Sequence, residues 1–341
     1  MLEGWMISNL AIAALAAAGV AVGIGVARNR LWKEACGQLW RRRPFALLVI
    51  ALYVAVAAAD SISWVGTDSE STDVVARYQA LSLVDRFFLG TEELSYSAPF
   101  SDVEFYGGAP LAHPAAHPLG TDILGRDVLY LALKGARVAL LIGGITSLIA
   151  MFLGLLFGVA AGYFGGRIDD AVFFLISTLS SIPGLLLLIT LIMVMGRSTL
   201  SVCVALGITS WVGFCRITRG ETFKLRELEY VQAARALGAS DVKIILRHVL
   251  PNLIHLVVIT LVLMFSGLVL SEAILSWLGI GVDGSWGQMI DQARDELSRE
   301  PIVWWNIVTA GGALFVLLLA VNFVGDAVRD VLDPRTLRED L

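Results

Sequence analysis

Long stretches without a charged residue constrain the fold of this chain more than any other feature of its sequence. Seven of these stretches are predominantly apolar, at residues 4–27, 44–59, 138–166, 171–196, 198–215, 249–271 and 301–325. A helix needs about 20 predominantly apolar residues to cross a bilayer, so each stretch predicts a membrane span. Because lipid offers backbone groups no hydrogen-bond partner, the spans are expected to be helices. Only 16% of the residues are charged, against about 25% in a typical soluble domain, which supports an all-α integral membrane protein.

Charge and motif content exclude several other classes. The net charge is −5, whereas a nucleic-acid-binding protein shows a basic patch or stripe. No Walker A, HExxH or GxSxG motif is present, so the chain is not itself expected to hydrolyse ATP or to be a hydrolase of those types. The pattern GxGxxG at 279–284 lacks a βαβ context and does not predict a dinucleotide site. We therefore expect no nucleic-acid partner and no cofactor bound by this chain.

The cysteines and histidines show no metal-ligand spacing. Buried free thiols are expected for the cysteines, and a solvated external loop is expected for the first two histidines. These residues are Cys36, Cys203, Cys215, His113, His117, His248 and His255.

Basic residues predict the orientation, because cytoplasmic loops are enriched in Lys and Arg. They gather in 28–43, in 216–247 and in the tail after 328, whereas 66–136 is rich in Asp and Glu. Threading seven spans places the three basic regions on one side. The N-terminus is therefore expected outside and the C-terminus in the cytoplasm. The first stretch lacks the basic start of a signal peptide, which favours an uncleaved helix.

This threading also divides the chain. An extra N-terminal helix with a basic cytoplasmic linker is expected at 1–43, a first core span at 44–66 and an external segment at 67–136. A core membrane domain follows at 137–335, with a cytoplasmic hairpin at 216–250, and a short tail at 336–341 ends the chain.

The hairpin has the pattern helix, break, helix, then entry into a span. Ala233 and Ala234 favour helix, Gly238 suits the left-handed position after a helix end, and Ser240 or Asp241 can cap the next helix. Pro251 is expected in the first turn of the following span.

This segment resembles the EAA motif of ABC-importer permeases, Glu-Ala-Ala-x3-Gly-x9-Ile-x-Leu-Pro. Ala233, Ala234, Gly238, Leu250 and Pro251 fall at the required spacing, while Gln232 replaces the glutamate and His248 the isoleucine. The resemblance makes the hairpin a candidate contact with an ATPase. The candidate coupling residues are Tyr230, Gln232, Ala233, Ala234, Leu237, Gly238, Leu250 and Pro251.

Further segments, at 117–127, 161–166, 275–281 and 325–334, resemble the dipeptide/oligopeptide (and nickel) subfamily of these permeases. The resemblance covers roughly 45–335 and implies a type I ABC-importer transmembrane domain with a six-helix core in a bacterial inner membrane. It implies a second homologous permease subunit, two ATPase subunits that bind ATP and Mg, an extracytoplasmic substrate-binding protein and surrounding lipid. Di- or oligopeptides are the implied substrates, and the extra helix departs from the family pattern.

Two features have alternative interpretations. The motif of Gly120, Thr121, Asp122, Gly125, Arg126 and Asp127 is expected at the external mouth, either as a structural elbow or as a docking surface. Glu272 is a candidate pathway or gate residue because intramembrane carboxylates are commonly functional; solvation at the interface is the alternative, as it is for Asp60. An ion-coupled secondary transporter and a membrane-embedded hydrolase are the competing functions, but the spans carry almost no charge at mid-membrane.

Overall fold

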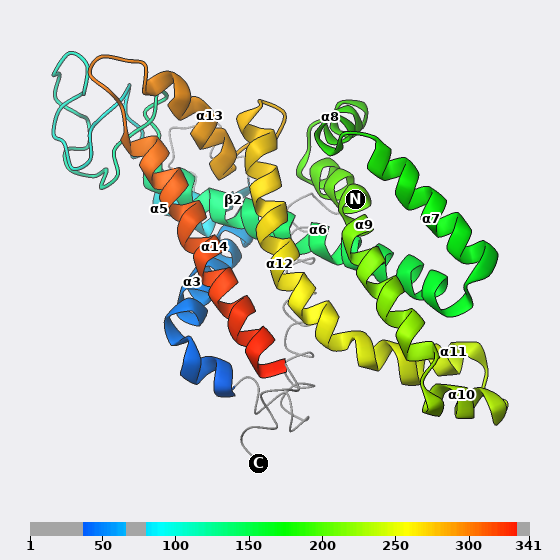
Figure 1. Ribbon diagram of the computed structural model, residues 1–341. Coiled ribbons are helices and arrows are strands. Elements are labelled where there is room, and N and C mark those ends of the chain that lie inside the picture. Colours follow the sequence, from blue (N-terminus) through cyan, green and yellow to red (C-terminus); the bar gives the residue numbers. More distant parts are fainter. Residues whose placement is uncertain (1–36, 66–79, 333–341) are drawn as a thin grey trace. The chain divides into compact units, whose positions relative to one another are not determined.

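The structure is a computed structural model that describes residues 37–65 and 80–332. The expected extra helix at 4–27, the cysteine Cys36 and the tail at 336–341 lie outside the described residues. The described chain divides into two compact units, which are treated separately below. Three long helices contribute to both units, namely α6 (Val128–Phe164), α12 (Leu250–Trp277) and α14 (Trp305–Leu332) (Figure 1).

Unit 1 contains the described residues up to Leu140 together with Ala273–Ala327. Its other elements are α3 (Pro44–Ser61), β1 (Ser63–Val65), β2 (Ala80–Ser82), α5 (Leu83–Phe87) and α13 (Trp286–Glu296). A proline in the first turn suits the start of α3, because the N–H groups there have no partner within the helix.

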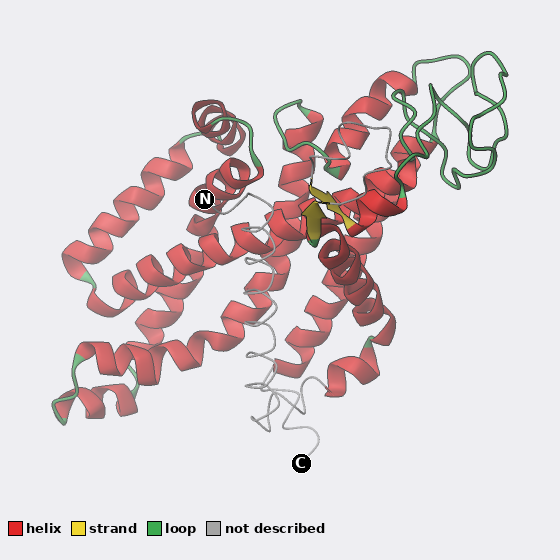
Figure 2. Ribbon diagram, turned by 180° about the vertical axis from the view of Figure 1, so that it is seen from behind, coloured by secondary structure: helices red, strands yellow, loops and turns green. Residues whose placement is uncertain are grey.

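The two strands form a small antiparallel sheet with Ser63 opposite Ser82 (Figure 2). It is a short addition to an otherwise helical fold, and the sequence did not predict it. Ser82 then starts α5, where its hydroxyl accepts from the N–H of Asp85 and the Asp85 carboxylate accepts from the N–H of Ser82. This reciprocal capping box satisfies two backbone donors at the helix start.

Unit 2 contains Leu141–Glu272 and the last residues of α14. Its other elements are α7 (Gly166–Ser181), α8 (Gly184–Met195), α9 (Thr199–Arg226), α10 (Glu229–Ala236), α11 (Asp241–Ile244) and the π-helical turn η1 (Ile245–Val249). Arg219 of α9 binds Asp169 of α7 through two hydrogen bonds, so the two helices are held together by charge as well as by apolar packing.

Five of the six spans predicted within the described residues are confirmed as helices that are long and apolar enough to cross a membrane, with shifted boundaries. In the described part of the chain, the sixth corresponds to α7 and α8, which are bent by 90° and make a span only if the pair is taken as one. The sequence predicted an unbroken span at 171–196. The break falls at Ile182-Pro183, because a residue before proline is driven from helical to extended backbone, and Ile182 has ψ of 132°.

Three glycines at four-residue intervals bring α6 against α9. A Cβ atom at Gly154 would lie 2.8 Å from the ring of Phe214, and one at Gly162 would lie 2.7 Å from the carbonyl oxygen of Arg219. At Gly158, between them, a Cβ would overlap the hydroxyl of Thr218. Small residues permit this close approach of backbones in membrane proteins, and it defines the core of unit 2.

The helix that follows the hairpin is continuous from Asp241 to Trp277. Pro251 is the second residue of α12 and so lies in its first turn, as expected, but α12 continues α11 and η1, so no separate helix begins there. A proline inside a helix lacks an N–H and clashes with the carbonyl four residues earlier. The π-helical turn η1 lies directly before it, where the Leu250 N–H donates to the carbonyl of Ile245. This wider turn adjusts the hydrogen-bond ladder so that the helix continues through the proline.

Candidate functional site: the coupling hairpin and the external segment

The hairpin consists of α10, a tight turn and α11. Gly238 has φ of +80°, in the left-handed region that the sequence predicts for it. The N–H groups of Gly238 and Ala239 donate to the carbonyls of Arg235 and Ala234 at 3.0 and 3.1 Å, which closes the end of α10. Ser240 occupies the cap position of α11, but its side chain makes no capping hydrogen bond.

One face of the hairpin packs on the end of α6. Val231 of α10 and Ile244 of α11 are buried in a cluster with Val159 and Tyr163 of α6. Ala234 is half-buried against the same cluster, and Leu250 packs there too. Of the two alanines predicted to allow a partner to approach, Ala234 thus faces the hairpin's own core and Ala233 is exposed.

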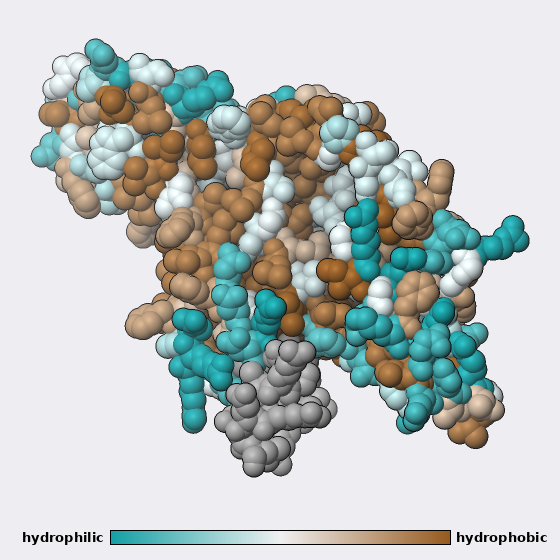
Figure 3. Space-filling view, in the orientation of Figure 1, coloured by the Kyte–Doolittle hydropathy of each residue, from teal (hydrophilic) through white to brown (hydrophobic). Residues whose placement is uncertain are grey.

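The opposite face is exposed and partly apolar. Its exposed candidate residues are Tyr230, Gln232, Ala233, Leu237, Gly238 and Pro251. Leu237, at the tip, is 87% exposed, although α10 is too short and too polar to be a membrane span. Hydrophilic side chains gather over the end of unit 2 that includes α10 and α11 (Figure 3). Single exposed apolar residues are ordinary on protein surfaces, and it is the resemblance to the EAA motif that makes this face a candidate contact.

The external motif is largely buried in unit 1. The Asp122 carboxylate is fully buried, and it accepts two hydrogen bonds from the Arg126 guanidinium, at 2.9 and 2.7 Å. It also accepts from the N–H groups of Leu124 and Arg126. Gly120 and Gly125 have φ of +76° and +71°, as tight turns require.

The remaining motif residues anchor this turn to its surroundings. Thr121 accepts from the N–H of Ser97 at 2.6 Å, and its carbonyl accepts from the indole of Trp305 at 2.9 Å. Asp127 accepts from the N–H of Leu129 at 2.7 Å and so caps α6. Burial and internal pairing favour the structural elbow over the docking surface.

His117 contradicts the expectation of a solvated histidine. It is 1% exposed, and its Nδ1 lies 2.9 Å from Asp127 Oδ2. Glu93 is buried beside it. Burial alone would raise the pKa of Glu93, but hydrogen bonds from the N–H groups of Ala112 and His113, with the neighbouring imidazoles, lower it overall. His113 is the more exposed member of the pair, with 41% of its side chain accessible and its Nδ1 3.5 Å from Glu93 Oε1.

Sequence reasoning also missed a charge cluster around Asp60, which is buried and not solvated. Lys134 Nζ lies 3.0 Å from Asp60 Oδ1 and 2.6 Å from Asp85 Oδ1. The Ser82 hydroxyl donates to Asp60 at 2.7 Å, and Arg137 approaches its second oxygen. A lysine and an arginine near the start of the next span were the available signal for a partner of this aspartate.

Glu272 and two cysteines lie within the membrane helices of unit 2. Glu272 is buried, which argues against the alternative that its carboxylate is solvated at the membrane interface. Its assignment as a pathway or gate residue stays a prediction. Cys203 and Cys215 are free and buried, as predicted. Among residues 37–65 and 80–332, no group of three or more His, Cys, Asp or Glu side chains is placed to hold a metal ion.

Comparison with known proteins identifies the family. The family described as "Binding-protein-dependent transport system inner membrane component" matches residues 154–338. The chain belongs to this family. It is therefore a multi-pass permease subunit of the inner membrane, as the resemblance implied.

The chain is 35% identical over 227 residues to the dipeptide transport system permease protein of Bacillus subtilis (strain 168), covering 66% of this chain and 70% of the relative. It is 34% identical over 303 residues to a putative peptide transport system permease protein of Brucella suis biovar 1, covering 87% and 90%. Among solved structures, an inward-facing MetNI methionine ABC transporter chain superposes with a TM-score of 0.50 at 20% identity, covering 60% of this chain and 97% of that one. The expected type I ABC-importer fold is confirmed.

Proposed function

We propose that this chain is one of two homologous permease subunits that together form the pathway of an ATP-driven importer for di- or oligopeptides. Family membership and the printed names of the relatives support this assignment. The family description includes a binding protein, so we expect an extracytoplasmic protein to deliver the substrate. Two ATPase subunits, which bind ATP and Mg, complete the proposed complex, and the chain itself performs no chemistry.

The observation that supports the coupling role most directly is the two-sided hairpin. Its inner face is fixed to α6 by Val231 and Ile244, while its outer face presents Leu237 and Tyr230. An ATPase cleft that receives the outer face would move the hairpin when the ATPase subunits close. Because the inner face is packed, that movement reaches the membrane helices. In the proposed orientation the hairpin is cytoplasmic, the N-terminus is outside and the C-terminus is inside.

The test is Leu237→Asp, with Leu94→Asp as the matched control. Leu94 is 90% exposed in the external segment, so the two changes place the same charge at similar exposure on different sides of the membrane. Loss of a central interface anchor costs about 2 kcal/mol or more. We therefore expect ATPase subunits to bind the Leu237→Asp permease at least about 30-fold more weakly, while Leu94→Asp retains them. Equal ATPase retention and equal peptide uptake by both variants would refute the coupling assignment.

The ion-coupled alternative finds no support in the comparisons. The two functions differ in what drives uptake into proteoliposomes. We expect uptake of a labelled dipeptide to require two components. The binding protein must be present on the side from which the dipeptide enters, and ATP must be present on the side of the membrane where the ATPase subunits lie. Dissipating the ion gradients with ionophores should leave that uptake unchanged. Uptake that needs an ion gradient but no ATP would overturn the proposal.

A further inference from the structure

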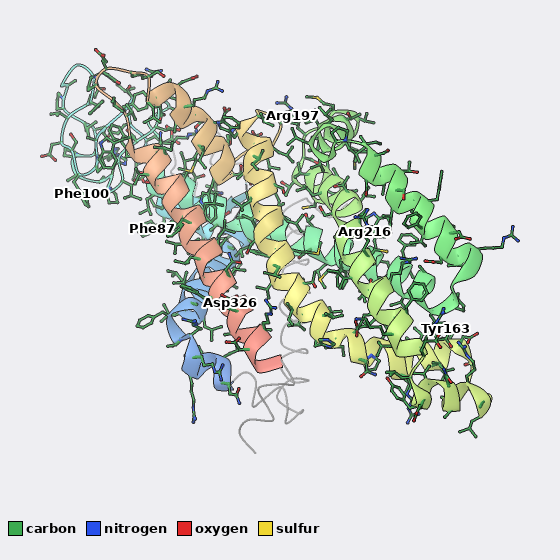
Figure 4. The ribbon with its side chains drawn as sticks, in the orientation of Figure 1. Phe87, Phe100, Tyr163, Arg197, Arg216 and Asp326 are labelled. Carbon is green, nitrogen blue, oxygen red and sulfur yellow. The ribbon has the colours of Figure 1, made fainter. Side chains whose placement is uncertain are left out.

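We propose that Tyr163 is a positioning residue that links the coupling hairpin to membrane helix α6, so that hairpin movement drives α6 instead of bending the hairpin alone. This inference rests on the proposed coupling function. Tyr163 is the penultimate residue of α6 and lies beside α10 and α11 (Figure 4). It belongs to the 161–166 segment, which was recognised only as a family resemblance.

Tyr163 contacts both helices of the hairpin through different parts of its side chain. Its hydroxyl donates to Asp241 Oδ1 of α11 at 2.7 Å. The guanidinium of Arg235, on α10, lies over its ring at 5.2 Å from the centroid. Arg235 Nη2 also lies 3.9 Å from the same Asp241 oxygen. One tyrosine therefore joins α10, α11 and the end of α6.

The backbone at this end of α6 is held as well. Arg226, the last residue of α9, donates from Nη1 to the carbonyl of Gly162 at 3.2 Å. A helix end leaves its final carbonyls without partners inside the helix, and the arginine satisfies one of them. The position of Tyr163 is thus fixed relative to α9, which leads into the hairpin through a two-residue link.

Apolar packing and polar contacts have different roles in holding the hairpin on α6. The buried cluster of Val159, Tyr163, Val231 and Ile244 keeps the hairpin folded against α6. Apolar packing is non-directional, so it permits sliding, whereas a hydrogen bond to a carboxylate has a preferred distance and angle. Removing only the hydroxyl should therefore preserve assembly and weaken the transmission of movement.

The test is Tyr163→Phe in the complete transporter reconstituted into proteoliposomes, with labelled dipeptide uptake and ATP hydrolysis measured together. Phenylalanine keeps the ring that packs in the cluster and faces Arg235. We expect normal ATPase retention and ATP hydrolysis, while the peptide imported per ATP falls about five- to tenfold, the scale of one ordinary intramolecular hydrogen bond. Tyr53→Phe is the control, because it removes another tyrosine hydroxyl that donates to a carbonyl, Ala313, at 2.9 Å.

A double-mutant cycle establishes whether Tyr163 acts through Asp241. In an Asp241→Ala background, Tyr163→Phe should cause no further loss of peptide imported per ATP. Wild-type import per ATP in Tyr163→Phe would overturn the proposal. A fall in uptake that only matches a fall in assembled complex, or fully independent effects of the two changes, would also overturn it. Failure of the wild-type permease to retain ATPase subunits would instead refute the proposed function.

Discussion

Replacing Gly158 by alanine tests the close packing of α6 on α9. The added methyl group would overlap the Thr218 hydroxyl and would lie 2.8 Å from the carbonyl oxygen of Cys215. The Cys215 carbonyl belongs to the α9 backbone and cannot rotate away. The Thr218 hydroxyl is buried and bonded to the Gly154 carbonyl at 2.9 Å, so it cannot move without losing a partner. Either α9 must shift or the helix must distort.

The expected magnitude follows from opposing contributions. Overpacking a close contact costs about 1–3 kcal/mol, and a lost interhelical hydrogen bond in a membrane protein costs about 0.6 kcal/mol more. Alanine favours helix over glycine by up to about 1 kcal/mol. The net prediction is a decrease of about 1–2 kcal/mol in the free energy of unfolding.

The assay is reversible unfolding of the purified permease in mixed detergent and SDS micelles, followed by circular dichroism. Gly144→Ala is the matched control, because Gly144 lies on the same helix and a Cβ there would meet nothing within 4 Å. We expect that variant to be unchanged or slightly more stable than the wild type. If Gly158→Ala were as stable as Gly144→Ala, the close approach of α6 and α9 would be refuted.

Four further predictions concern the hairpin, the external segment and the topology. Gly238→Val forces a β-branched residue to φ of +80° at a cost of about 1–3 kcal/mol; membrane levels should persist while peptide uptake is lost. Arg126→Ala leaves the buried Asp122 carboxylate without its guanidinium and should reduce the yield of assembled complex, not merely stimulation by the binding protein. The pKa of Glu93 in the folded protein is lowered from its ordinary value of 4.5. Its ionised carboxylate therefore stabilises the fold above pH 4.5, and this stability is lost as the pH falls through the pKa of the folded protein. Glu93→Gln should destabilise the protein near neutral pH and make no difference in strong acid. A Ser8→Cys variant should react with an impermeant thiol reagent from outside.

Local properties of the sequence predicted most of the helices. A charge-free apolar run can be read without knowing its neighbours, and so the spans within the described residues were found. The bend at Pro183 was visible in the same way, but the apolar run around it was long enough to be read as one span. The left-handed backbone conformation at Gly238 was predicted correctly, because that conformation depends mainly on the residue itself being glycine.

The missed features depend on partners distant in the sequence. Asp60 is buried because Lys134 and Arg137, at the start of α6, compensate its charge. His117 is buried because Glu93 and Asp127 enclose it. In each case the polar residue, considered without its partners, is expected to be exposed to water. Only the partners that the fold brings next to it allow it to be buried.

The proline of the hairpin motif shows how one local prediction changes the functional argument. Read from the sequence, Pro251 starts a new helix, which would leave a joint between hairpin and span. In the structure, η1 lets α11 continue into α12 without a break. A continuous helix transmits displacement along its axis, while Tyr163 links the hairpin sideways to α6. In the proposed mechanism, movement of α10 is passed to two membrane helices at once. Weakening the Tyr163 contact should therefore lower import per ATP without abolishing it.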